Sequence, residues 1–198
     1  MVRFAAFLLL AAVLVLPRQA TSHPHVWIDA HATLRLEGGT VQALAITWRF
    51  DDFFSSMMLE DFAGKGGKAF DAKSQAALRD QVMLPMSEFA FFTHAAANGE
   101  KLPITKIEDF RAEIEKGRVI FHFIALLPRS VDPKKEVFSL GLYDESYYVD
   151  VQLDKWDPIR FSSADAPGCA VDIAEDTSNP LYYGAFFPKL ATLNCVSG

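Results

Sequence analysis

Alternation of apolar and polar residues constrains the fold of this chain most strongly, because it favours strands whose two faces differ. The alternation is clearest over residues 25–36 and 41–50, and the second of these segments has the sequence VQALAITWRF. Between them stands EGGT, a short glycine-bearing segment that suits the turn of a hairpin. The two segments therefore predict a pair of neighbouring strands.

The rest of the chain predicts further strands and one helical region. Residues 71–96 carry apolar side chains at helical spacing, with Asp71 as an N-cap and Pro85 as an interruption that predicts a kink or two helical pieces. Strands are predicted within 101–127 and 136–153, and the chain beyond Asp157 is predicted to be irregular. The hairpin-like spacing predicts an α+β fold, a mostly antiparallel sheet with one interrupted helical stretch packed on it.

Residues 1–22 have the layout of a secretory signal peptide. Arg3 precedes an apolar run of 13 residues that Pro17 ends, and the small residues Ala20 and Ser22 stand before the expected cut. A membrane anchor is the alternative, but the run is short of the roughly 20 residues that span a bilayer. We expect cleavage after Ser22 and export to the periplasm. No cysteine lies near the cut, so lipid attachment there is excluded.

The mature chain, residues 23–198, has a length that suits a single domain with one sizeable core. Cleavage would remove Arg3 and Arg18 and no acidic residue, so the net charge would move from −6 to −8. This acidity argues against nucleic acid as a partner, and the mature protein is not expected to be embedded in a membrane.

The two cysteines, Cys169 and Cys195, both lie near the C-terminus. In an exported chain such a pair predicts one disulfide, which would close the C-terminal segment. A soft metal site is the alternative, but no CxxC or Cys-x-His spacing supports it. We therefore interpret these cysteines as structural.

The expected new amino terminus, HPHVWIDAHATL, holds three of the five histidines of the chain. Cleavage would give His23 a free amine beside its imidazole, and both groups are nitrogen donors for a metal ion. His25 can add a third nitrogen, since residues two apart on a strand share a face with Cα atoms about 6 to 7 Å apart. The segment therefore predicts a brace-like metal site.

Pro24 excludes one familiar alternative. A square-planar amino-terminal chelate needs the backbone nitrogen of the second residue to lose a proton, and proline has no proton there. On a continuous strand Asp29 would lie about 13 Å and His31 about 20 Å from His25. We therefore interpret Asp29 as a buried hydrogen-bonding group and His31 as a surface or packing histidine.

Further ligands would have to come from other parts of the fold. His94 and His122 stand among apolar residues, where a hydrogen-bonded histidine without a metal is the plain interpretation, although one of the two could complete a site. Asp51 and Asp144 stand among aromatic residues and could supply an oxygen ligand or orient a ligating histidine. The alternative is that both are exposed carboxylates of turns. The candidate metal ligands are His23, His25, Asp51, Asp144 and His122.

At these residues the chain resembles a known family. The segments HPHVWIDA, ITWRFDDFFS, FFTHAAANGEKLP and LYDESYYVDV, in this order over residues 23–152, are similar to the periplasmic domain-of-unknown-function family one-thousand-and-seven. Members of that family are described as periplasmic components of ABC-type transport systems, and they are often encoded near nickel/cobalt exporters or zinc uptake systems. The tyrosine-rich motif of the family usually has Pro-Thr where this chain has Glu145 and Ser146, whereas Asp144, Tyr147 and Tyr148 match.

These observations favour a periplasmic metal-binding protein, a zinc chaperone or accessory protein of a metal transporter, and not an enzyme. Nitrogen and carboxylate ligands suit zinc; copper is the competitor, and nickel or cobalt would also fit. A periplasmic solute-binding protein or the transporter itself would be the partner. One alternative is a copper monooxygenase with a histidine brace, although those enzymes take the second histidine from far along the chain. Another is an exported interaction domain without a metal.

Overall fold

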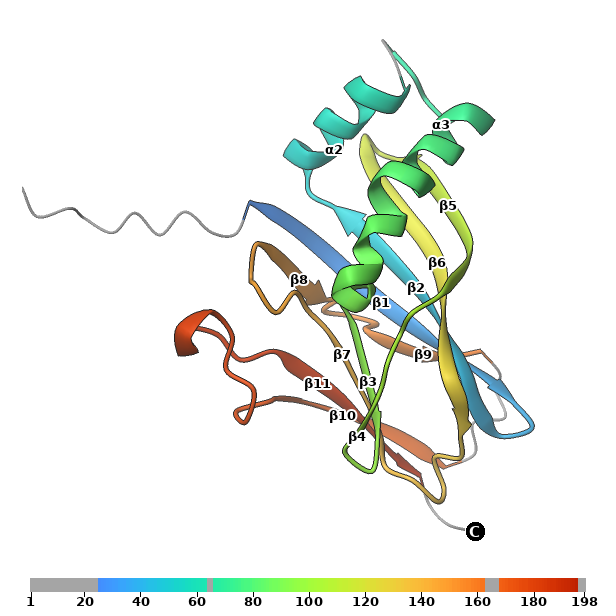
Figure 1. Ribbon diagram of the computed structural model, residues 1–198, viewed down its shortest axis with the longest axis vertical. Coiled ribbons are helices and arrows are strands. Elements are labelled where there is room, and N and C mark those ends of the chain that lie inside the picture. Colours follow the sequence, from blue (N-terminus) through green and yellow to red (C-terminus); the bar gives the residue numbers. More distant parts are fainter. Residues whose placement is uncertain (1–24, 64–65, 163–167, 196–198) are drawn as a thin grey trace, which may run out of the picture.

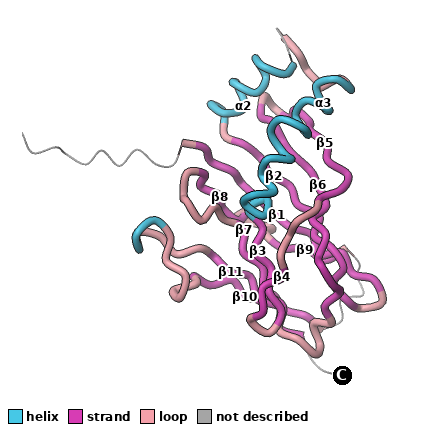
Figure 2. Tube along the Cα trace, in the orientation of Figure 1, coloured by secondary structure: helices cyan, strands magenta, loops and turns pink. Residues whose placement is uncertain are grey.

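The computed structural model describes residues 25–63, 66–162 and 168–195, and its strands form two sheets (Figure 1). The strands are β1 (Val26–Glu37), β2 (Thr40–Phe50), β3 (Thr93–Ala97), β4 (Glu100–Leu102), β5 (Ile107–Glu115), β6 (Arg118–Val131), β7 (Phe138–Leu142), β8 (Val149–Leu153), β9 (Ile159–Phe161), β10 (Cys169–Glu175) and β11 (Lys189–Cys195). The helices are α2 (Asp52–Met58) and α3 (Ala72–Leu78), continued by the helical turns η1 (Leu59–Ala63), η2 (Arg79–Met83) and η3 (Leu84–Phe92); η4 (Tyr182–Gly184) is a separate turn. Figure 2 shows the larger helical segments gathered at one end of the molecule.

The hairpin of β1 and β2 forms as the sequence predicts. The two strands pair antiparallel from Ile28 opposite Phe50 to Glu37 opposite Thr40. Gly38 and Gly39 make the two-residue turn with φ angles of 58° and 81°. Positive φ at both positions matches the twist of the flanking strands and is available to glycine without strain.

The first sheet has the order β5-β6-β2-β1-β8, and β9 also pairs with β1. Both β8 and β9 run parallel to β1, β8 beside Val26–Ala30 and β9 beside Ala32–Leu34. The other pairings of this sheet are antiparallel. The predicted α+β class and the mostly antiparallel pairing are therefore confirmed, but strands are arranged in two sheets and one of them is mixed.

The second sheet has the order β10-β11-β7-β3-β4. Its strands β10 and β11 lie where the sequence was predicted to be irregular, so that prediction is wrong. The reason is that β10 alternates only between half-buried and exposed side chains, which leaves a weak apolar signal.

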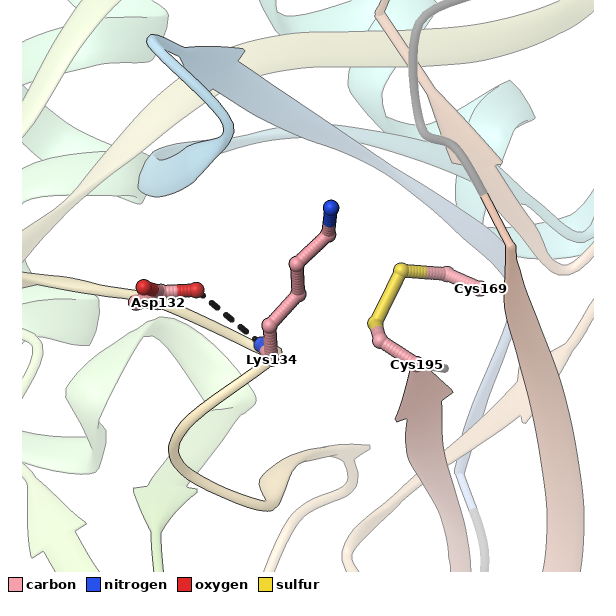
Figure 3. Close-up of a disulfide and its surroundings, with 4 residues drawn as sticks. All are labelled: Asp132, Lys134, Cys169 and Cys195. Carbon is pink, nitrogen blue, oxygen red and sulfur yellow. Dashed lines mark hydrogen bonds between the residues drawn. A yellow bond between two sulfur atoms is a disulfide. The ribbon is translucent and has the colours of Figure 1, made fainter. Parts of the chain in front are cut away.

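The predicted disulfide is present between Cys169 and Cys195, which are partners in the pairing of β10 with β11. Figure 3 shows the bond at the adjacent ends of these strands, near a loop in which the backbone N–H of Lys134 donates to Asp132 Oδ1 at 3.0 Å. The bond joins two strand ends that are 26 positions apart in the sequence.

Both sheets bury side chains in a single core cluster. Along β1 the buried side chains are those of alternate residues from Val26 to Leu34, and the intervening side chains are exposed or half-buried. The second sheet contributes Phe138, Leu140 and Leu193 to the same cluster. Burial of apolar surface from both sheets is the main stabilising contribution to such an architecture.

The helical region differs from the prediction in its extent. Asp71 caps α3 as predicted, since the backbone N–H of Ser74 donates to its carboxylate at 2.8 Å. Pro85 is the second residue of η3, at the change from the turn η2 to a tighter helical turn. The chain becomes extended at Thr93, before the predicted end at 96, and α2 adds a helix that the sequence analysis did not assign.

Contacts of the helices with the first sheet are made by side chains. The Gln75 side chain exchanges two hydrogen bonds with the backbone of Ala112 in β5, and Leu78 and Met83 belong to the core cluster. Within the described part of the chain, none of the helices has the length and apolar character of a membrane span.

We expect the double substitution of Cys169 and Cys195 by serine to lower the free energy of unfolding by about 3 to 4 kcal/mol, because the unfolded chain loses a closed loop of 26 positions. Urea unfolding of the variant and of the oxidised protein measures this loss. The protein reduced with dithiothreitol is the control and should match the variant. Equal midpoints for the oxidised and the serine forms would contradict the expectation.

Candidate functional site

The first described residue, His25, lies against the segment that precedes β8. Its backbone N–H donates to the carbonyl oxygen of Tyr148 at 3.0 Å, and its ring lies 4.8 Å from the Tyr148 ring, centroid to centroid. The side chain of His25 is exposed, and that of Tyr148 is half-exposed. The imidazole therefore lies at the surface, beside the parallel pairing of β1 with β8.

Asp144 organises the turn that leads to Tyr148. Its side chain is only 4% exposed. One carboxylate oxygen accepts from the backbone N–H and the hydroxyl of Ser146, and the other accepts from the backbone N–H groups of Tyr148 and Val149 at 3.1 and 3.0 Å. A carboxylate with this many donors is an anchor for the backbone around it.

The family difference at Glu145 and Ser146 has a structural counterpart. The Ser146 hydroxyl lies 2.8 Å from both oxygens of Asp144, so the serine contributes a donor to the turn. Tyr147 occupies the left-handed region with a φ of 55°. The turn is therefore closed by hydrogen bonds to Asp144 in this chain, without a proline.

Asp51 joins the start of β1 to the start of α2. Its Oδ2 accepts from the backbone N–H of Trp27 at 2.9 Å, and its Oδ1 accepts from that of Phe54 at 2.9 Å, which caps α2. Its own backbone N–H donates to the Trp27 carbonyl oxygen at 3.0 Å. Both oxygens of this predicted ligand are thus engaged with backbone N–H groups.

The structure brings three of the predicted residues to one end of β1. His25 directly precedes the strand, Asp51 bonds to Trp27, and Asp144 holds the turn that contacts His25. His23 lies outside the described residues. Among the residues that the structure describes, no three histidine, cysteine, aspartate or glutamate side chains are placed so that they could hold a metal ion.

His122 lies elsewhere on the first sheet. It stands opposite Thr47, which in turn stands opposite His31, six residues along β1 from His25. Its Nε2 lies 2.7 Å from Glu113 Oε1, and its Nδ1 lies 3.0 Å from Thr47 Oγ1. Since a carboxylate accepts, Nε2 is the donor there, and both ring nitrogens have hydrogen-bond partners.

The interpretation of Asp29 as a buried group is wrong, because its side chain is exposed. It follows the buried Ile28 on β1, so the alternation of the strand turns it toward solvent with His31. His31 is half-buried, as a surface or packing histidine should be. Burial lowers the pKa of His31, Arg160 lowers it further, and Asp154 and Asp157 oppose the shift.

His94 lies away from His25, in a groove of about 650 Å³ between the end of η3 and the second sheet. Its ring stacks on that of Tyr143 with centroids 3.8 Å apart, and its Nε2 donates to the Tyr143 carbonyl oxygen at 2.9 Å. Its Nδ1 lies 3.9 Å from a carboxylate oxygen of Glu145. Burial lowers the pKa of His94, whereas the bond to Tyr143 and the charge of Glu145 oppose the shift.

Two sets of contacts in this region were not predicted. Tyr148 contacts His25 through both its backbone and its ring, and Ser146 completes the Asp144 turn. The sequence carried a signal for Ser146, since Asp-x-Ser is a spacing at which a side chain closes a turn on its own backbone. It carried none for the pairing of Tyr148 with His25, which are more than a hundred positions apart.

The fold and this region define a sheet-rich α+β protein with a disulfide and an exposed histidine directly before the strand β1. The chain belongs to the family described as protein of unknown function (DUF1007), whose model matches residues 8–182.

Two relatives are also described only as uncharacterized. One, a 15.5 kDa protein in the trpE 3′ region of Spirochaeta aurantia, is 26% identical over 134 residues, which cover 68% of this chain and 95% of that protein. The other, from Haemophilus influenzae, is 24% identical over 143 residues, which cover 72% of this chain and 68% of that protein. No solved structure matches the chain.

We expect Asp144→Asn to lower the free energy of unfolding by about 3 kcal/mol, because the amide cannot accept from all the buried donors that the carboxylate satisfies. Asp150→Asn is the matched control. Asp150 lies in the same segment and bonds the Gln152 side chain at the surface, so its substitution should change stability by less than about 0.5 kcal/mol. Equal effects in urea unfolding would contradict the anchoring role of Asp144.

The lowered pKa of His94 predicts a loss of stability on acidification. Protonation of a half-buried imidazole costs more in the folded protein than in the unfolded chain, so the unfolded chain binds more protons below the ordinary value of 6.5. The free energy of unfolding should therefore fall as the pH drops below 6.5, and His94→Gln should remove part of this dependence. Urea unfolding between pH 7.5 and 5 measures it. The same slope in both proteins would contradict the expectation.

Proposed function

We propose that this protein is a periplasmic metal-binding protein, a zinc chaperone or accessory protein of a metal transporter. The observation that supports the proposal is the position of His25, an exposed imidazole at the start of β1 beside the Tyr148 turn. A free terminal amine and imidazole at His23, two residues earlier, would supply the remaining nitrogen donors.

In this proposal the carboxylates of Asp51 and Asp144 position the strand and are not direct ligands of the metal ion. The hydrogen bonds of Asp51 fix the backbone of Trp27, and those of Asp144 fix the turn that receives the N–H of His25. Both aspartates therefore support the part of β1 from which the imidazole projects. Nitrogen donors in this surface position suit zinc and leave the ion accessible to a receiving protein.

The proposed location rests on the predicted signal peptide and on the disulfide, which is typical of oxidising compartments outside the cytosol. A periplasmic solute-binding protein or the transporter itself would be the partner that receives the metal. Copper, nickel and cobalt are competing ions for a nitrogen-rich site.

Isothermal titration with zinc tests the proposal on the protein that begins at His23. We expect His25→Ala to weaken zinc binding by at least tenfold, because the substitution removes a nitrogen donor. An additional alanine before His23 should also weaken it, since the terminal amine becomes an amide. Affinity should fall from pH 7.5 to 5.5, where the amine and imidazoles gain protons.

The matched control is His31→Ala, which lies on β1 six residues beyond His25. It should leave zinc affinity unchanged. Equal zinc affinity for His25→Ala and the unaltered protein would overturn the proposal. A substrate oxidation that requires copper and ascorbate would favour the histidine-brace enzyme instead, if His25→Ala abolishes it.

A further inference from the structure

A cavity of about 410 Å³ lies between the inner face of the first sheet and the helical segment above it. Its floor comes from β1, β2 and β6, through residues such as Val26 and Ile28, and its roof comes from Val82 to Phe92. Seven of its lining side chains carry aromatic rings, those of Trp48, Phe50, Phe54, Phe89, Phe92, Phe121 and Tyr148. This size and this lining are typical of small-molecule sites.

The lining is also nearly without charge. Among the described residues that form it there is no lysine, arginine or histidine, and the single carboxylate belongs to Asp144. That carboxylate is engaged by the donors of its own turn. An ionic group inside the cavity would lose its hydration and gain no counter-ion, which is costly. The chemistry of the wall therefore selects an uncharged ligand.

The roof of the cavity is held in a strained conformation. Ala90, Phe91 and Phe92 follow one another with φ angles of 51°, 52° and 49°, a left-handed region that such residues rarely adopt. The turn buries Phe91 and Phe92 and leaves Phe89 half-exposed at the cavity. Strain of this kind persists only where surrounding packing maintains it, and it is concentrated at functional sites.

The two methionines of the roof add adaptability. Met83 is fully buried and Met86 is partly buried, and both line the cavity. Unbranched thioether side chains fill irregular space and contact aromatic rings well, so they accommodate ligands of different outline. We propose that this cavity is a binding site for an uncharged, largely aromatic or aliphatic small molecule. The proposal does not depend on metal binding at His25.

A pair of fluorescent probes tests both the site and its charge preference. N-phenyl-1-naphthylamine is uncharged, and 8-anilino-1-naphthalenesulfonate has the same rings with one sulfonate. We expect the uncharged probe to bind saturably at one site per chain, and at least tenfold more tightly than the sulfonate. Absence of saturable binding, or equal affinity for the two probes, would overturn the proposal.

Substitutions locate the binding. Met86→Trp should fill the cavity and lower the affinity for the uncharged probe at least tenfold. Leu84 is exposed on the same helical turn and does not line the cavity, so Leu84→Trp should leave this affinity unchanged. Val82→Lys should shift preference toward the sulfonate, and Gln81→Lys beside it should not. The Lys variants test the site if the Trp variant fails to fold. Unchanged probe preference in Val82→Lys would contradict the assignment.

A second copy of the chain is the other possible occupant. Sedimentation of the unaltered protein without probe shows whether the chain is a monomer or a dimer, and so distinguishes the two occupants. A dimer that Met86→Trp dissociates would overturn the small-molecule proposal, and a monomer at the same concentrations would support it.

Discussion

The arrangement around His25 depends on the satisfaction of one buried carboxylate. Asp144 would be destabilising in the interior without hydrogen bonds, and it obtains them from the backbone of the turn that precedes β8. This turn places the Tyr148 carbonyl oxygen within hydrogen-bond distance of the His25 N–H and Val149 opposite Val26. The charged group therefore determines where the parallel pairing begins, and the wall of the apolar cavity follows from the same turn.

The sequence predicted those parts of the fold whose signals are local. Two glycines at a turn and an aspartate before a helix act over three or four residues, so the first hairpin and the cap at Asp71 formed as expected. The strands β10 and β11 and the helix α2 were not predicted, because their local signals are weak. Both faces of β10 are partly exposed, and α2 has few residues in which a helical period could show.

Part of the candidate site could also be predicted, because the sequence motifs that contain His25, Asp51 and Asp144 meet at the start of β1. The hydrogen bonds of the two aspartates could not be predicted, since their partners are backbone N–H groups brought near by tertiary structure. The error at Asp29 was avoidable. Its neighbours Ile28 and Ala30 are apolar, so the alternation of the strand already assigned Asp29 to the solvent face.

The parallel partners of β1 have a consequence for how the chain acquires its structure. During synthesis from the N-terminus, β1 and β2 are complete more than a hundred residues before β8 and β9 exist. One edge of β1 therefore stays open through most of the chain's production, and contacts between such distant segments form slowly. An open edge is a template for pairing with strands of other molecules, so the chain is exposed to aggregation during this interval.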